Sequence, residues 1–203
     1  ETKLEVDRRR LVLRVHKLQR QLRAVGSHRR NQSKRRRRSY NQSVAIVGYT
    51  NAGKSTLLNL LADSDSVVAD RLFATLDPLT RRIQLPGGES IFVTDTVGFV
   101  QKLPHQLIEA FKTTLDVVIE ADLLLHIVDC SHASPETQIK AVRSVLEEIG
   151  AGDIPEILVF NKADRSDPSE LLMLYPDSVA ISSYTGAGID KLLSAVADQL
   201  RVV

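Results

Sequence analysis

The amino-acid sequence predicts an α/β domain with a mostly parallel sheet. From Val44 onward, short apolar segments alternate with longer segments of helical periodicity. This alternation is βαβ order, which implies a parallel sheet with helices on both faces. The 203 residues, 43% of them hydrophobic, suffice for one such domain with an appendage. No apolar run approaches the roughly 18 residues of a membrane-spanning helix, so we expect no membrane span.

The expected strands and helices follow one another along the chain. Strands are expected at Val44–Gly48, Arg82–Leu85, Ser90–Thr94, Leu123–Val128, Ile157–Phe160 and Val179–Ile181. Helices are expected at Lys54–Leu61, Leu107–Ile119, Glu136–Ile149 and Ile189–Gln199. The second and third strands flank PGGE at residues 86–89, a sequence typical of a hairpin turn, so these two strands should form an antiparallel pair.

Residues 1–43 differ in charge from the rest of the chain. They hold 15 Lys or Arg and 3 Asp or Glu, whereas the other 160 residues hold 12 and 22. Apolar residues at heptad spacing predict an N-terminal helix here, at Leu4, Leu11, Val15, Leu18, Leu22 and Val25. We therefore divide the chain into a basic helical linker, 1–43, and an α/β domain, 44–203. The basic run is typical of contact with nucleic acid, and a solvated charge run is the alternative.

Cysteine content bears on the compartment in which the chain works. The single cysteine, Cys130, excludes an internal disulfide and fits the reducing cytoplasm. The chain begins at Glu1 and not at Met, so a targeting segment, and with it an organellar location, stays open. We expect a monomer.

A phosphate-binding loop is predicted at Gly48–Ser55. Its sequence GYTNAGKS fits G-x-x-x-x-G-K-S, and it follows a predicted strand and opens a predicted helix, the context that this motif requires. The glycines allow backbone N–H groups to surround phosphates, and the helix N-terminus adds a favourable dipole. Lys54 should reach the β- and γ-phosphate oxygens, and the Ser55 hydroxyl should bind Mg²⁺.

The sequence NKAD at Asn161–Asp164 indicates that the phosphates belong to a guanine nucleotide. The Asp of such a motif accepts hydrogen bonds from N1 and the 2-amino group of guanine, and the Asn supports O6 or N7. Adenine lacks this pair of donors, so a carboxylate left unpaired would reject it. The stem of Lys162 can lie along the base plane. A backbone N–H of the later loop SSYTGAGI, residues 182–189, should meet guanine O6.

The segment DTVGF at residues 95–99 is typical of a sensor of the terminal phosphate. Asp95 should hold Mg²⁺ through a water, and the Gly98 N–H should contact the γ-phosphate. Phe99 stands where Ras-type switches have the Gln that orients the attacking water, so intrinsic hydrolysis should be slow. A Thr within residues 69–82 should complete the Mg²⁺ shell, and spacing alone leaves Thr75 and Thr80 open.

Four segments together resemble the HflX family of GTPases, namely GYTNAGKS, LFATLDPLTRR, DTVGFVQKLPHQLIEAF and ADLLLHIVD. The resemblance implies a Ras-like P-loop GTPase fold with a mostly parallel six-stranded sheet. It also implies that the preceding helix is the remnant of an N-terminal domain, and that Thr75 is the switch threonine and a Mg²⁺ ligand. The implied partners are the large ribosomal subunit with its 23S-type rRNA and the 70S ribosome, which family members split under stress.

The motifs and the resemblance together give the candidate site. The nucleotide-binding residues expected are Gly48, Tyr49, Thr50, Asn51, Ala52, Gly53, Lys54, Ser55, Thr56, Phe73, Ala74, Thr75, Leu76, Asp77, Asp95, Thr96, Val97, Gly98, Asn161, Lys162, Ala163, Asp164, Ser182, Ser183 and Tyr184. The catalytic residues expected are Lys54, Thr75, Gly98 and Asn51. The Mg²⁺ ligands expected are Ser55, Thr75 and, through a water, Asp95.

Two substitutes for the missing Gln are consistent with the sequence. Asn51 is placed to help bind a K⁺ ion near the phosphates, as in other GTPases with a hydrophobic residue at the Gln position, or it only favours the turn conformation. The ribosome is the second substitute, by ordering the switch segments and excluding bulk water. Two other functions stay open: a nucleotide-gated RNA- or ribosome-binding module with incidental hydrolysis, and an Era- or TrmE-type GTPase in RNA maturation or tRNA modification.

Overall fold

The computed structural model describes residues 42–62, 79–96, 98 and 112–202. The chain divides into two units, Glu1–Asn41 and Gln42–Val203, and the described residues all belong to the second. The predicted N-terminal helix and basic run therefore lie outside the described residues, as do residues 63–78 and 99–111. Gln42 is bound to the domain, because its Nε2 donates to the Leu200 carbonyl at 2.8 Å.

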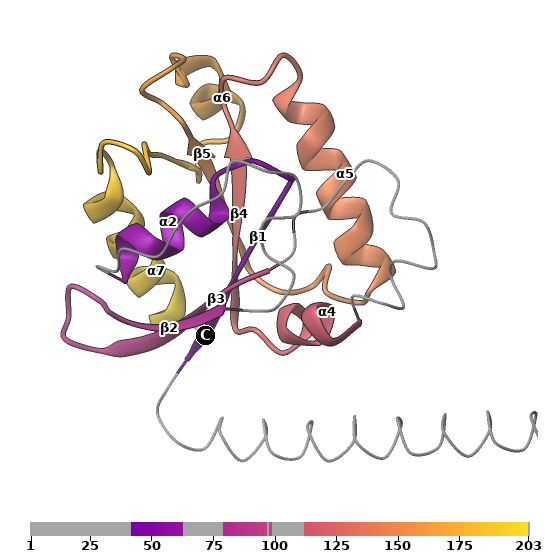
Figure 1. Cartoon of the computed structure of the whole chain (residues 1–203), viewed down its shortest axis with the longest axis vertical. Helices are drawn as coiled ribbons and strands as arrows, with labels where there is room; N and C mark the ends of the chain where they lie inside the picture. Colours follow the sequence, from indigo (N-terminus) through magenta and orange to yellow (C-terminus); the bar gives the residue numbers. More distant parts are fainter. Residues whose placement is uncertain (1–41, 63–78, 97, 99–111, 203) are drawn as a thin grey trace, which may run out of the picture. The chain divides into compact units, whose positions relative to one another are not determined.

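A six-stranded sheet forms the centre of the domain, in the order β2-β3-β1-β4-β5-β6 (Figure 1). The strands are β1 (Ser43–Gly48), β2 (Leu79–Gln84), β3 (Ser90–Asp95), β4 (Leu123–Asp129), β5 (Glu156–Asn161) and β6 (Val179–Ala180). β2 and β3 pair antiparallel, and the other neighbours pair parallel. The predicted mostly parallel six-stranded sheet is confirmed.

The second strand corrects one prediction. We expected Arg82–Leu85, but β2 runs from Leu79 to Gln84 at the edge of the sheet. Its first part is polar, so the apolar pattern did not reveal it. Leu85 belongs to the turn instead, because its N–H donates to the Glu89 carbonyl at 2.8 Å and its carbonyl accepts from Gly88 at 2.9 Å.

Helices cover both faces of the sheet. They are α2 (Lys54–Leu61), α4 (Lys112–Ile119), α5 (Pro135–Glu148), α6 (Ser169–Leu174) and α7 (Ile189–Val202). In Figure 1, α2 and α7 lie to the left of the sheet, and α4 and α5 lie to its right. The sequence did not predict α6, whose six residues are too few for a periodic pattern. It packs through Leu171 and Leu172 against the core cluster that contains Phe160.

Strand β1 shows why the core has two layers. Its side chains alternate between the faces, as in any strand. Val44 and Ile46 belong to the core cluster with α2 and α7 residues, and Ala45 and Val47 belong to the cluster with α4 and α5 residues. The four residues are each 0–1% exposed. Because both faces of the strand are covered, every position must be apolar, which explains the unbroken apolar run.

The register of the parallel strands positions the candidate site. β1 ends at Gly48 and β3 at Asp95, while β4 and β5 end side by side, with Asp129 opposite Asn161. The carboxyl ends of parallel strands share one edge of the sheet, where ligands bind in open α/β sheets. The loops that carry the predicted motifs therefore meet at this edge. Among the described residues, no helix has the length and apolar character to cross a membrane.

Candidate nucleotide-binding site

The predicted phosphate-binding loop connects β1 to α2, which begins at Lys54. Its two glycines are required by close approach. A Cβ on Gly48 would lie 2.3 Å from the Ile127 carbonyl oxygen, and one on Gly53 would lie 2.3 Å from Asn161 Nδ2. Gly53 also has a φ of 96°, in the left-handed region that disfavours other residues. Gly53 caps α2 without a side-chain hydrogen bond, so the N–H groups of the first turn can bind an anion.

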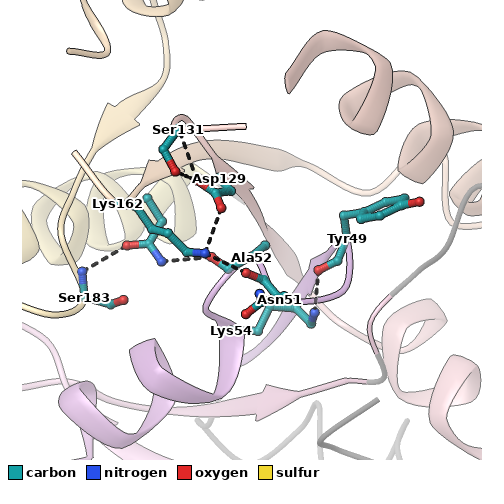
Figure 2. Close-up of polar contacts among 9 residues, drawn as sticks. Tyr49, Asn51, Ala52, Lys54, Asp129, Ser131, Lys162 and Ser183 are labelled. Carbon is teal, nitrogen blue, oxygen red and sulfur yellow. Dashed lines mark hydrogen bonds and ion pairs between the residues drawn. The ribbon is translucent and has the colours of Figure 1, made fainter. Parts of the chain in front are cut away.

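Lys54 is a cation that the loop holds in a buried position. Its side chain is 6% exposed, and Nζ donates to the Tyr49 carbonyl at 2.9 Å (Figure 2). Burial lowers the pKa of Lys54 from 10.5 to about 8, and the negative charge of Asp95 opposes that change. A phosphate beside Nζ would favour the charged form, so the buried ammonium is suited to an anionic ligand.

Ser55 and Asp95 form a pair of oxygen ligands suited to Mg²⁺. The Ser55 hydroxyl donates to Asp95 Oδ2 at 2.6 Å, and the Asp95 carboxylate is buried at the end of β3. Because the hydroxyl proton is directed to the carboxylate, the lone pairs of Ser55 Oγ can bind a cation. The described residues contain no cluster of three His, Cys, Asp or Glu that could hold a metal alone.

Asn161 joins the phosphate-binding loop to the loop after β6. It is fully buried, Nδ2 donates to the Ala52 carbonyl at 2.9 Å, and Oδ1 accepts from the Ser183 N–H at 2.9 Å. Figure 2 shows this link, with Ser183 on one side and the phosphate-binding loop on the other. The Ser183 N–H is therefore engaged within the protein, although we proposed a backbone N–H of this loop as a partner of the base.

Asp164, three residues after Asn161 in the chain, is held by Ser182. The Ser182 hydroxyl donates to Asp164 Oδ1 at 2.5 Å and also accepts from the Thr185 N–H at 3.1 Å. Because the hydroxyl fixes one carboxylate oxygen, the orientation of the whole carboxylate is set before any base arrives. Tyr184, by contrast, is 86% exposed.

Lys162 spans the edge of the sheet. Its Nζ donates to the Asn51 carbonyl at 2.9 Å and lies 2.7 Å from Asp129 Oδ2 (Figure 2). Asp129 ends β4 and was not among the predicted site residues. Its position was detectable from the sequence, because the strand LLLHIVD ends at the same edge as the strand before NKAD. The site therefore includes an ion pair that motif matching missed.

The predicted switch residues are only partly described. Gly98 lies against the phosphate-binding loop, since a Cβ there would be 2.8 Å from Thr50 Cα and 3.0 Å from Lys54 Nζ. The Thr96 hydroxyl donates to the Ile46 carbonyl at 2.7 Å, so this side chain binds the sheet. Thr80 lies within β2, with Oγ1 2.9 Å from Thr94 Oγ1. The remaining switch candidates lie outside the described residues: Phe73, Ala74, Thr75, Leu76, Asp77, Val97 and Phe99.

Asn51 and the remaining predicted contacts lie in the phosphate-binding loop, at the start of α2 and in the NKAD segment. Asn51 has a φ of 61°, a left-handed conformation that Asn tolerates better than most residues, which agrees with its interpretation as a turn residue. Thr50 and Ala52 are buried in the phosphate-binding loop. Thr56 lies in the first turn of α2. Ala163 donates its N–H to the Ile181 carbonyl at 3.1 Å.

Comparison with known proteins agrees with this geometry. Residues 43–162 match the model of a family described as 50S ribosome-binding GTPase. GTPase HflX of Caldanaerobacter subterraneus is 47% identical over 98% of this chain, and GTPase HflX of Escherichia coli is 42% identical over 98%. The matched parts are 46% and 48% of those two proteins, so the chain spans about half the length of these curated relatives. The predicted resemblance to HflX is confirmed.

Two solved structures are similar in fold. A GTP-binding protein from the archaeon Sulfolobus solfataricus, in complex with GDP, has a TM-score of 0.69 at 23% identity, covering 97% of this chain and 60% of that one. Era in complex with MgGDPNP and a segment of 16S ribosomal RNA has a TM-score of 0.64 at 25% identity, covering 79% and 57%. These similarities agree with the predicted Ras-like P-loop fold. The chain belongs to the family of 50S ribosome-binding GTPases, and GTPases HflX are among its curated relatives.

Proposed function

We propose that this chain binds GTP with Mg²⁺, hydrolyses it slowly, and acts as a switch that associates with the large ribosomal subunit. The observation that carries the proposal is the convergence of three groups at one sheet edge. They are the buried Lys54 ammonium, the Ser55–Asp95 oxygen pair and the Asp164 carboxylate held by Ser182. Together they match a phosphate chain, its Mg²⁺ and a guanine base.

Each group has a separate task in this mechanism. Lys54 binds the β- and γ-phosphate oxygens and stabilises the negative charge that develops there as the γ-phosphoryl group leaves. When bound, Mg²⁺ neutralises part of the charge on the β- and γ-phosphates. Ser55 and Asp95 position that cation, and Thr75 is proposed as its third protein partner. The Gly98 N–H contacts the γ-phosphate, so loss of that phosphate releases the switch segment.

The attacking water has no Gln to orient it, since the sequence has Phe99 at that position. We expect slow turnover by the chain alone and at least about tenfold stimulation by purified large ribosomal subunits, because a partner can supply the missing ordering. The measurement is phosphate release at fixed GTP against subunit concentration, at several salt concentrations. Small subunits serve as the control. An unchanged rate at saturating large subunits would refute the partner's role for this chain.

Potassium is proposed as a second aid to hydrolysis, through Asn51. The residue precedes Ala52–Lys54, and the expected result is severalfold faster phosphate release in KCl than in NaCl at equal ionic strength. Asn51→Asp also tolerates the left-handed conformation, so it does not separate the turn role from the ion. Asn51→Gly keeps the turn and removes the side chain, so it separates the two roles. Loss of the KCl effect in Asn51→Gly supports the ion. Equal wild-type rates in the two salts would leave Asn51 with its turn role only.

The proposal extends to the setting in which the domain works. We propose a monomer in the cytoplasm that contacts 23S-type rRNA, with the basic segment 1–43 contributing phosphate contacts. Splitting of stalled 70S ribosomes is proposed for the whole protein, because this chain spans about half the length of its curated relatives. The alternative is a role in RNA maturation, which the similarity to Era, solved with a segment of 16S ribosomal RNA, keeps open. Identifying the RNA that co-purifies with the chain separates large-subunit binding from that role.

A further inference from the structure

Two residues of the site hold an unfavourable backbone conformation. In the described part of the chain, Asn51 and Lys162 are the non-glycine residues with positive φ, at 61° and 67°. They lie 111 positions apart, on the phosphate-binding loop and on the loop that carries the guanine motif. One hydrogen bond joins them, from Lys162 Nζ to the Asn51 carbonyl. Conformations of this kind persist at functional sites where surrounding contacts determine them.

Asp129 is the contact that fixes the Lys162 end of this link. Its Oδ2 lies 2.7 Å from Lys162 Nζ, and the two side chains are 16% and 18% exposed, so solvent screens the pair only partly. The ammonium is thereby held between a carboxylate of β4 and a carbonyl of the phosphate-binding loop. Because a Lys side chain has many rotamers, a second partner greatly restricts where its Nζ can lie.

Asp129 is itself fixed by its own loop. Oδ1 accepts from the Ser131 N–H at 2.9 Å and from the Ser131 hydroxyl at 2.6 Å. Burial opposes ionisation, but the hydrogen bonds from Lys162 and Ser131 outweigh it and lower the pKa of Asp129. The backbone adds a further tie, because the Cys130 N–H donates to the Asn161 carbonyl at 3.0 Å. The end of β4 is therefore a rigid base for the ion pair.

We propose that Asp129 is a positioning residue for nucleotide binding: through Lys162 it fixes the guanine loop and the phosphate-binding loop at the spacing that one GTP molecule needs. The inference rests on the proposed function. It assigns Asp129 no contact with the nucleotide. Its effect is to remove, before binding, the freedom of the two loops that the ligand must otherwise order.

Asp129→Asn is expected to weaken binding of both GDP and GTP roughly tenfold, as loss of a hydrogen bond to a charged group does. The weaker binding should appear mainly as faster dissociation of GDP, because the preformed site of the wild type holds the ligand longer. The turnover rate at saturating GTP should stay within about twofold, because Asp129 does not touch the phosphates. Ser131→Ala keeps the charge but removes one hydrogen bond to Asp129, and a smaller loss of affinity is expected.

Asp167→Asn is the matched control. Asp167 accepts from the N–H and hydroxyl of Ser169 two positions on, at 3.1 and 2.6 Å, which copies the local pattern of Asp129 and Ser131. This variant should bind GDP as the wild type does. The decisive measurement is a double-mutant cycle with Lys162→Met. If Asp129 acts through Lys162, Asp129→Asn should add little further loss in the Lys162→Met background.

The outcomes separate this inference from the function beneath it. A wild-type chain that fails to bind GDP overturns the proposed function itself. A wild-type chain that binds GDP, with Asp129→Asn and Ser131→Ala both unchanged, overturns only the role of Asp129. Full additivity in the cycle also overturns it, because Asp129 would then act through another route. Thermal unfolding of each variant without nucleotide shows whether a loss of affinity is caused by unfolding. If Asp129→Asn is unfolded, the affinity of the folded Ser131→Ala variant tests the role of Asp129.

Discussion

Replacing Asp164 by Asn should shift the base preference of this domain from guanine toward xanthine by at least about a hundredfold, because a site built to hydrogen-bond one base edge strongly rejects another. The amide can still accept the Ser182 hydroxyl through Oδ1, so the orientation seen in the wild type is retained. Its new Nδ2 donor then faces the 2-amino group of guanine, which is also a donor, but matches the 2-oxo group of xanthine.

The measurement is competition of GDP and XDP for the same fluorescent nucleotide on wild type and variant. Asp177→Asn is a suitable control, because Asp177 is an exposed carboxylate between α6 and β6. It should leave the ratio of the two affinities as in the wild type. If Asp164→Asn keeps the full preference for GDP, the carboxylate does not read the base and the assignment of the guanine loop fails.

Replacing Lys54 by Ala should abolish measurable hydrolysis and weaken GDP binding by more than about a hundredfold, because a buried cation paired with phosphate is lost. The folded domain should survive the change, since burial lowers the pKa of Lys54 and the charge is held at a cost when no anion is bound. Lys140→Ala, on the exposed face of α5, is the control and should bind normally. Normal GDP affinity in Lys54→Ala would contradict the placement of the phosphates.

The charge of Lys54 also gives a pH signature. With a pKa of about 8 in the empty site, Lys54 is partly neutral at pH 8, and a bound phosphate raises that pKa. GDP binding should therefore take up part of a proton at pH 8 and almost none at pH 6. Calorimetry in two buffers of different ionisation enthalpy measures this uptake, and Lys54→Ala should lack it. Because the unfolded chain keeps a pKa near 10.5, the contribution of Lys54 to the free energy of unfolding should rise with pH between about 8 and 10.5.

The elements that the sequence revealed best are those with a steric or packing requirement of their own. Gly48 and Gly53 are dictated by atoms 2.3 Å away, so the loop motif marks real geometry. The apolar run of β1 is dictated by helices on both faces. The edge strand β2 was placed wrongly, because a polar edge strand carries no such requirement. The short helix α6 had too few residues to show periodicity.

The candidate site divides in the same way. Motif spacing pointed to Lys54, Ser55, Asp95 and Asp164, whose side chains are proposed to act on a ligand. It did not show that Asn161 joins two loops, or that Asp129 pairs with Lys162, because such contacts arise between strands distant in sequence. These contacts depend on the order of the strands in the sheet, which a sequence motif does not specify. The choice between Thr75 and Thr80 likewise came from the HflX resemblance and not from spacing.

The antiparallel ribbon of β2 and β3 has a mechanical consequence. Leu79 begins β2 directly after segment 63–78, and Asp95 ends β3 directly before the segment that starts with Thr96 and Val97. The register places Leu79 opposite Asp95, so the two predicted switch segments adjoin the same residue pair of the β2–β3 ribbon. A displacement of the backbone at Leu79 is therefore expected to reach Asp95 directly, across a single pair of residues. In the proposed function, a partner that binds one predicted switch segment would act on the other through the same pair of residues.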